Sequence, residues 1–312
     1  MRASQDMAGG PAAGRDRPAG QDFSRGDAFL YSVIILMWGT SWFAIKMQLG
    51  VVSPEVSVAY RFALAAILLF VWLAITRKPL RFAGRHHLAF AAMGATMFPT
   101  NFALFYHAGF FLVSGLLAVV FSTVPVFNML NAFIFLRERP SGKVLLASGM
   151  GIAGLLTIFA PDILAHGFDH DTATGLVLCV LATYSFSLGN IVSARNQRIG
   201  LPVMSGNAYG MAYGAIMLCT YAILSGTAFT FDPSIVYVSS LLWLAIGASV
   251  IAFASYLTLL GRVGPSRAGY VTIVFPIVAL VLSMQYEAYQ FSIWALAGLA
   301  LVVAGNLMII RK

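Results

Sequence analysis

Long apolar runs alternate with short polar segments along most of the chain. A helix needs about 20 apolar residues to cross the hydrocarbon core of a bilayer. Ten runs near that length occupy residues 28–47, 54–76, 87–107, 113–136, 143–160, 174–194, 203–224, 236–260, 267–286 and 291–310. The pattern predicts an all-α membrane protein with ten transmembrane helices.

Positive charge is confined almost entirely to alternate gaps between these runs. Of the 19 Lys and Arg residues, all but Lys46 and Arg61 lie before the first run, after the last run or in every second gap. The other gaps hold no positive charge and carry most of the acids. Because positive loops stay on the cytoplasmic side during insertion, we expect a multi-pass protein of the cell inner (plasma) membrane with cytoplasmic N- and C-termini.

The composition agrees with a membrane protein, since 60% of residues are hydrophobic and 10% are charged, whereas a soluble domain has roughly 25% charged residues. The formal net charge of +8 is spread over six segments rather than gathered on one face, so we do not expect nucleic acid as a partner. We expect a small-molecule substrate and the lipid bilayer as partners, and a monomer or weak homodimer. Cys179 and Cys219 both lie inside apolar runs and predict ordinary packing residues.

The chain divides into a tail and two similar halves. Residues 1–26 are polar and rich in Gly and Ala, which predicts a disordered cytoplasmic tail. Residues 27–160 and 173–312 are expected to form one five-helix repeat each. Residues in matching positions lie 151 apart, and the matched pairs are Pro125 and Pro276, Ser141 and Ser292, Ala147 and Gly298, and Gly154 and Gly305.

The number of helices in each half determines their relative orientation. Because five is odd, the second half must enter the membrane with opposite topology. This predicts an inverted repeat, an architecture in which the binding site lies near the membrane midplane between the halves.

Several segments resemble a known family. They are WGTSWFAIK at 38–46, AYRFALAAILL at 59–69, SGLLAVVFSTVPVFNMLNAFIFLRERPS at 114–141 and a Gly-rich fifth run. Together with the ten runs, they make residues 28–310 similar to the EamA-like members of the drug/metabolite transporter superfamily. The resemblance implies a secondary transporter but no particular substrate. The second half departs from the pattern, since Tyr289 stands where the family's acid would match Glu138, and Glu287 comes two residues early.

Arg61 is the most unusual residue, because it lies within the second apolar run, where an unpaired charge is costly. One interpretation is a positive site for a carboxylate or phosphate of the substrate. The other is a structural charge satisfied by carbonyl groups, lipid headgroups or Glu55. We favour the structural interpretation at this stage, since the family resemblance at this position extends to members with unrelated substrates.

The polar and aromatic residues inside the runs predict the lining of a central cavity. Their side chains carry no net charge apart from Arg61, so a neutral, zwitterionic or aromatic substrate fits best. Helix packing also favours small and polar residues, and it remains an alternative. The candidates are Trp38, Ser41, Trp42, Arg61, Asn101, Tyr106, Phe121, Asn128, Tyr184, Ser187, Asn190, Tyr256 and Thr272.

Pro125 and Pro276 are hinge candidates. Each proline removes a backbone hydrogen bond and kinks its helix. Their matching positions in the two halves suggest paired bending points, although membrane helices also tolerate proline without any mechanical role.

No motif indicates an enzyme, a cofactor or a metal site. His166 and His170 are four residues apart and close to acids, but Gly167 interrupts the helix that would align them. Proton-coupled carriers generally need a titratable group inside the membrane, and the only candidates are His107, Glu55 and Glu287. The energy source therefore stays open.

We expect an exporter of small organic metabolites, amino-acid-like or aromatic, that works by alternating access. An importer of a vitamin or nutrient is an alternative within transport. A membrane interaction or sensor protein without transport is an alternative outside it, and an integral-membrane enzyme ranks third.

Overall fold

The computed structural model describes residues 24–137, 142–166, 170–256, 258–259, 271–289 and 292–310, and every regular element within these ranges is a helix. The expected tail up to residue 23 and the turn with Glu138 lie outside the described residues. Thr272 belongs to a described helix, but its side chain lies outside the description.

The first part of the chain forms seven helical segments, with a short π-helix, η1, joining two of them. The bounds are α1 Arg25–Lys46, α2 Pro54–Ile75, α3 Gly84–Ala95, η1 Thr96–Thr100, α4 Asn101–Ala108, α5 Ser114–Phe121, α6 Val124–Leu136 and α7 Gly142–His166.

The second part contains long helices and a second π-helix, η2, which follows α10 directly. The bounds are α8 His170–Arg198, α9 Val203–Leu224, α10 Ile235–Leu242, η2 Trp243–Ile251, α12 Val271–Tyr286 and α13 Ile293–Ile310.

Six helical stretches within the described residues are long and apolar enough to cross a membrane. They are Arg25–Lys46, Pro54–Ile75, Gly84–Ala108, Ser114–Phe135, His170–Arg198 and Ile235–Tyr256. Shorter apolar helices cover Leu145–Ala160, Val274–Tyr286 and Ile293–Met308. The protein is therefore an all-helical, multi-pass membrane protein, as its hydrophobic pattern predicts.

The apolar run at 113–136 is not one continuous helix. It divides into α5 and α6 at Ser122 and Thr123, whose hydroxyl groups donate to the carbonyl oxygens of Val119 and Val120, both at 2.6 Å. Pro125 lies in the first turn of α6, where its missing N–H leaves no hydrogen bond unmade. Side-chain bonding to the backbone and the proline together explain the break.

Three element boundaries also differ from the sequence-based expectation. Helix α1 begins at Arg25 rather than after residue 26, because Ser24 and Asp27 form a capping box at its N-terminus. The gap at 161–172 between the two expected repeats is mostly helical, since α7 continues to His166 and α8 starts at His170. Apolar length predicts where a helix crosses the bilayer, but not how far it extends beyond it.

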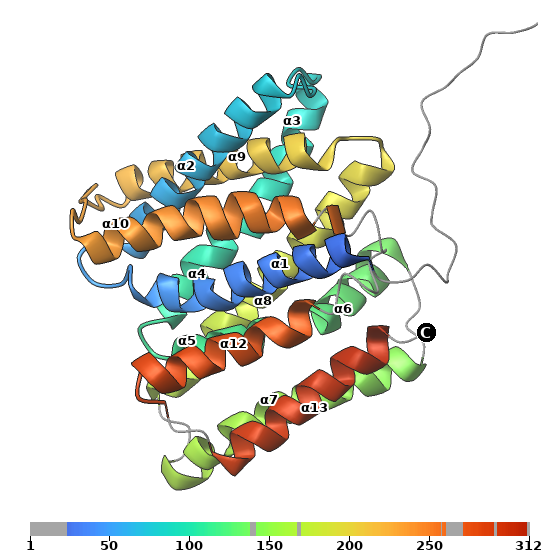
Figure 1. Cartoon of the computed structure of the whole chain (residues 1–312), viewed down its shortest axis with the longest axis vertical. Helices are drawn as coiled ribbons and strands as arrows, with labels where there is room; N and C mark the ends of the chain where they lie inside the picture. The colour runs from blue at the N-terminus through green and yellow to red at the C-terminus, as the bar shows by residue number, and fades with distance from the viewer. Residues whose placement is uncertain are drawn as a thin grey trace, which may run out of the picture.

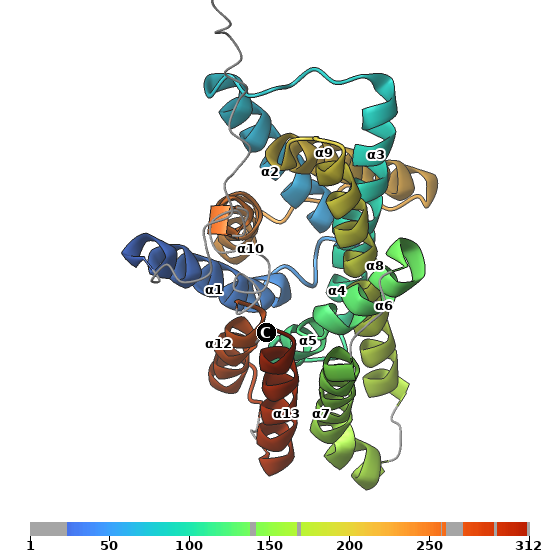
Figure 2. The same ribbon diagram turned by 90° about the vertical axis from the view of Figure 1, so that its right-hand side faces the viewer.

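The helices lie side by side in one bundle, with the α7 and α13 pair at one edge and α2, α3 and α9 at the other (Figure 1). Helix α1 packs against α12, and α4 packs against α8. The view turned by 90° shows the same two edges on either side of α1, α4 and α5 (Figure 2). The middle of the bundle is thus built from helices that are far apart in the sequence.

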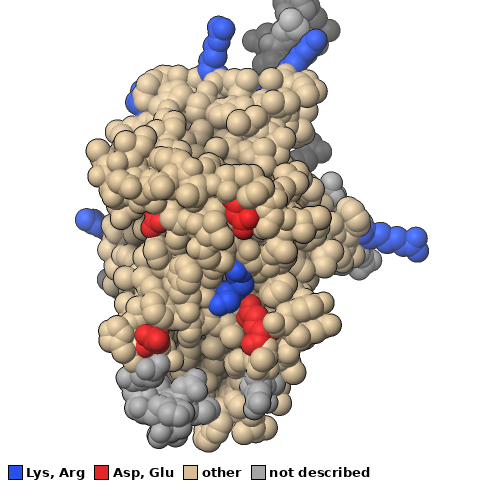
Figure 3. Space-filling view, turned by 90° about the vertical axis from the view of Figure 1, so that its left-hand side faces the viewer, with Lys and Arg blue, Asp and Glu red and all other residues tan. Residues whose placement is uncertain are grey.

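Charged residues separate toward the two ends of the bundle. Four of the described acids, Glu55, Asp171, Asp232 and Glu287, lie at helix ends where α1 finishes and α2 begins. Asp27 differs from them, because it lies in the first turn of α1 at the opposite end. Figure 3 views the end with the four acids, where acidic side chains occupy separate places around a central basic group and other basic groups project only at the margins. The helix directions place Arg25, Arg77 and Arg198 at the end opposite to these acids.

Candidate functional site

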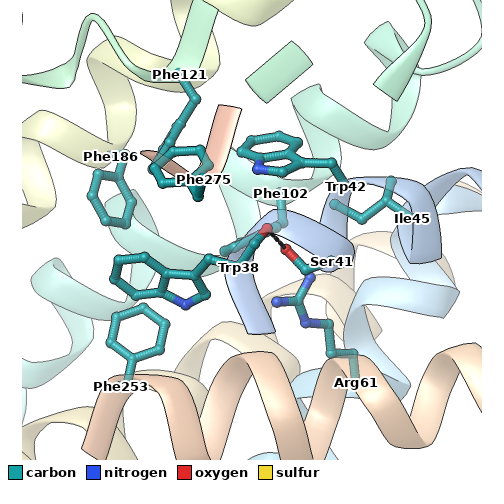
Figure 4. A pocket seen from close by; sticks show the side chains of 10 residues that line it. All are labelled: Trp38, Ser41, Trp42, Ile45, Arg61, Phe102, Phe121, Phe186, Phe253 and Phe275. Carbon is teal, nitrogen blue, oxygen red and sulfur yellow. Dashed lines mark hydrogen bonds between the residues drawn. The ribbon is translucent and has the colours of Figure 1, made fainter. Parts of the chain in front are cut away.

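A pocket lies in the middle of the bundle (Figure 4). The space between its side chains is about 450 Å³, including the part that is open to the outside. Seven of its ten lining side chains are aromatic, and one carries a charge. The lining consists of Trp38, Ser41, Trp42, Ile45, Arg61, Phe102, Phe121, Phe186, Phe253 and Phe275.

One face of α1 supplies four of these residues, because positions 38, 41, 42 and 45 repeat at helical spacing. The indole of Trp38 donates from Nε1 to the carbonyl oxygen of Ala248 at 3.2 Å, which ties α1 to η2. Ser41 donates from Oγ to the carbonyl oxygen of Trp38 at 2.8 Å. That bond satisfies the Ser41 hydroxyl hydrogen and leaves its oxygen able to accept a hydrogen bond from a ligand.

A cluster of rings closes another side of the pocket. Phe121, the last residue of α5, contacts Trp42, Phe186 and Phe275, with ring centroids at 5.3, 4.9 and 6.1 Å. Phe275 of α12 in turn lies 6.4 Å from Trp42 in a stacked arrangement. Pairs at these distances are stabilising and hold the rings in defined orientations. The pocket therefore offers rigid flat walls to a ligand.

Arg61 supplies the one charge among the ten described lining residues. Its side chain is 1% exposed, and Nε donates to Ser249 Oγ at 3.1 Å. The guanidinium carbon lies 4.2 Å from the centroid of the Phe102 ring and 5.1 Å from that of Phe62. These contacts hold the cation by one hydrogen bond and two ring faces, and the Tyr106 hydroxyl group also lies close enough to interact with it.

No carboxylate neutralises Arg61 within the described residues. Glu55, one of its expected partners, instead lies 2.7 Å from His107, measured from Oε1 to Nε2. The Arg61 Nη1 atom is buried and has no hydrogen-bond partner in the part of the chain that the structure describes. A buried donor without a partner carries a desolvation cost.

The two π-helices shape this part of the site. In η2, Ser249 donates to the carbonyl oxygen of Leu244, five residues earlier, at 2.9 Å, and its oxygen accepts from Arg61. In η1, Pro99 has no backbone N–H to donate. The wider turns displace the helix backbone locally, and such segments are frequent at functional sites.

Some predicted lining residues join helices instead of facing the pocket. Asn101 Nδ2 donates to the carbonyl oxygen of Ala182 at 2.8 Å, and Asn190 Nδ2 donates to Asn128 Oδ1 at 3.2 Å. Ser187 Oγ accepts from Asn131 Nδ2 at 2.9 Å. These bonds connect α8 to α4 and α6, which is the helix-packing role of polar residues in membranes.

The predicted tyrosines are not among the residues that line the pocket. Tyr106 donates to Gln48 Oε1 at 2.5 Å and lies close enough to interact with Arg61. Tyr256 packs against Trp38, with ring centroids 5.3 Å apart. Tyr184 contacts Phe127 at 5.9 Å.

The residues that sequence reasoning missed are all apolar: Ile45, Phe102, Phe186, Phe253 and Phe275. Ile45 continues the Trp38–Trp42 face of α1, and Phe186 lies next to the candidate Ser187, but apolar side chains such as these are common throughout the membrane runs. The usable signal was the surplus of phenylalanine beside the predicted cavity residues.

The two hinge candidates differ in local structure. Pro125 follows the break between α5 and α6, whereas Pro276 lies inside α12, which is helical from Val271 to Tyr286. Paired bending of the two halves at these residues stays a prediction.

The titratable groups at one end of the bundle hold segments together. Glu287 Oε2 accepts from the backbone N–H of Ser114 at 2.7 Å and from Ser283 Oγ at 3.0 Å. Lys46 Nζ donates to the carbonyl oxygens of Gly109 and Leu112. This network links α1, the segment before α5, and α12.

Comparison with known proteins shows which family the chain resembles. The model of the EamA-like transporter family matches residues 26–160 and 173–311, which confirms the resemblance to the drug/metabolite transporter superfamily.

The chain is 24% identical over 275 residues to the uncharacterized transporter YoaV of Bacillus subtilis strain 168, a match that covers 88% of this chain and 93% of YoaV. It is 26% identical over 298 residues to a protein of Escherichia coli K12 named a probable amino-acid metabolite efflux pump, covering 90% and 96%. A solved crystal structure superposes with a TM-score of 0.67 at 18% identity, covering 91% of this chain and 96% of the other.

Proposed function

Because the chain belongs to the EamA-like transporter family, we propose that it is a secondary transporter that exports small organic metabolites, amino-acid-like or aromatic, by alternating access. The central aromatic pocket is the observation that carries the proposal. Its walls come from both regions that match the family, since Trp38 and Phe121 belong to the first and Phe186 and Phe275 to the second. A site between two such halves fits a carrier in which the halves move about a bound substrate.

Contacts between α7 and α13 support an inverted repeat. Gly154 and Gly298 approach so closely that a Cβ on either would strike the carbonyl oxygen of the other, and a Cβ on Gly305 would lie 2.6 Å from the carbonyl oxygen of Ala147. In the 151-residue register, Ala147 corresponds to Gly298 and Gly154 to Gly305. The contacts are therefore reciprocal, as expected when a two-fold axis relates the two helices.

The π-helices lend further support to ten spans in two equivalent halves. Shifting η1 at 96–100 by 151 residues places it at 247–251, inside η2 at 243–251. Both halves thus contain the same irregularity at the same position of the third span.

We place both termini in the cytoplasm, because the basic gaps lie at one end of the bundle and most of the described acids lie at the other. Basic segments stay on the cytoplasmic side during insertion. Ala83 and Ala228 are both exposed and lie at opposite ends. In a variant in which Cys179 and Cys219 are replaced by alanine, a membrane-impermeant thiol reagent should label Ala228→Cys in intact cells and label Ala83→Cys only after permeabilisation. Labelling with the opposite sidedness would contradict the orientation.

Export rather than import is supported by relatives named as efflux pumps. The test is transport by purified protein in liposomes loaded with labelled aromatic acids, amino acids, nucleobases or flavins. We expect efflux of aromatic or amino-acid-like compounds above that from protein-free liposomes. Transport restricted to a vitamin in the inward direction would favour import, and no transport of any compound would favour an interaction or sensor role.

A further inference from the structure

The Arg61 guanidinium is positioned to bind an anion inside the pocket. It lies among the lining residues with its charged end directed toward Ser41 and the rings (Figure 4). Nε is occupied by Ser249, whereas Nη1 is buried without a partner in the described chain. A guanidinium with a free terminal nitrogen can donate charge-assisted hydrogen bonds to a carboxylate.

The charge of the pocket limits the ligand to one negative charge. Arg61 is the single cation among the ten lining residues. Lys46, which follows the lining residue Ile45 at the end of α1, is held by the carbonyl oxygens of Gly109 and Leu112. A monoanion would neutralise the site, whereas a phosphate dianion would bring a second charge with no partner and a large desolvation cost.

The remaining lining residues favour a ligand with a flat apolar group. Seven aromatic rings surround the space, and flat apolar walls favour a flat apolar ligand through offset and edge contacts. None of the ten described lining residues is a carboxylate, so an α-ammonium group would find no counter-ion among them. Ring faces attract cations, but this attraction recovers only part of the hydration that a buried ammonium group loses.

We infer that the pocket binds an aromatic monocarboxylate without an α-ammonium group, with its carboxylate on Arg61 and its ring among Trp38, Trp42 and Phe121. This inference rests on the proposed function, because it names the substrate class of the same pocket. It narrows that function, since zwitterionic amino acids become poorer ligands than the corresponding aromatic acids. The carboxylate of the ligand would supply the counter-charge that the described residues do not provide to Arg61.

Ligand binding to the purified full-length protein in lipid nanodiscs tests this inference. Three probes share one phenyl ring: 3-phenylpropionate, the neutral 3-phenylpropanamide and L-phenylalanine. Calorimetry should show 3-phenylpropionate binding about tenfold or more tightly than the amide, as expected for a buried hydrogen bond to a charged group. L-phenylalanine should bind more weakly than 3-phenylpropionate.

Variants connect this preference to Arg61. Arg61→Gln should bind the acid and the amide equally, whereas Arg195→Gln, which removes an exposed arginine on α8, should keep the wild-type ratio. If Arg61→Gln does not fold, Ser249→Ala serves instead, because loss of the Nε anchor should weaken acid binding and spare amide binding.

Equal affinity for acid and amide in the wild type, or an acid preference that survives Arg61→Gln, would overturn the inference. So would L-phenylalanine binding as tightly as the acid. Binding and transport are separate measurements: acid-selective binding without efflux would refute the proposed function alone, and efflux without acid preference would refute this inference alone.

Discussion

Replacing Arg61 with methionine is expected to raise the thermal stability of the protein while nearly eliminating transport of aromatic acids. The guanidinium is buried and has no carboxylate partner in the described chain. Exchanging even a buried ion pair for apolar residues of similar volume is often neutral or stabilising by roughly 1–4 kcal/mol, and Arg61 has no ion pair in the described chain to lose. Ser249 keeps its bond to the Leu244 carbonyl oxygen, so the change leaves no new unpaired donor there.

The loss of transport follows from the same contacts. A hydrogen bond to a charged group contributes about 1.5–3 kcal/mol, and about 1.4 kcal/mol corresponds to a factor of ten. Transport of an aromatic acid per folded molecule should therefore fall by roughly one to two orders of magnitude. Thermal unfolding and efflux are measured on the same preparation, with Arg195→Met as the control for removing an arginine.

The opposite outcome assigns Arg61 a structural role. A variant that unfolds at lower temperature but transports normally per folded molecule would mean that Arg61 stabilises the bundle through Ser249, Phe102 and Phe62. This was the interpretation that the sequence favoured, with Glu55 as one possible partner. The sequence could not reveal that Glu55 pairs with His107, because that contact depends on how α2 and α4 meet.

Apolar periodicity predicts where most helices lie but not where their hydrogen-bond pattern changes. The runs at 54–76 and 203–224 correspond closely to α2 at 54–75 and α9 at 203–224. The runs at 87–107 and 236–260 contain η1 and η2, which the apolar pattern does not predict, because a π-helix is as apolar as the α-helix around it. Pro99 and Pro125 were the available signals of η1 and of the break before α6.

The candidate site was only partly predictable for a related reason. Trp38, Ser41, Trp42, Arg61 and Phe121 come together in the pocket. Asn101, Asn128 and Asn190 were expected beside them and instead join helices. A polar side chain inside a membrane needs a hydrogen-bond partner, and the sequence does not distinguish a partner helix from a ligand. The phenylalanines that complete the walls resemble ordinary lipid-facing or packing residues until the bundle is assembled.

The central claim, that the aromatic pocket carries the transported molecule, is tested most directly by filling the pocket. Ser41 points into it from α1, whereas Ser32 is exposed on the same helix and bonds to the Ala28 carbonyl oxygen. Ser41→Leu adds apolar volume to the space beside Arg61, and Ser32→Leu adds the same volume outside it.

The measurement is efflux of labelled 3-phenylpropionate and L-phenylalanine from liposomes containing wild-type protein, Ser41→Leu or Ser32→Leu. Overpacking costs about 1–3 kcal/mol, so efflux of the carried compound should fall about tenfold or more in Ser41→Leu and stay at the wild-type level in Ser32→Leu. Undiminished efflux from Ser41→Leu, or wild-type efflux of both compounds no faster than from protein-free liposomes, would contradict the claim.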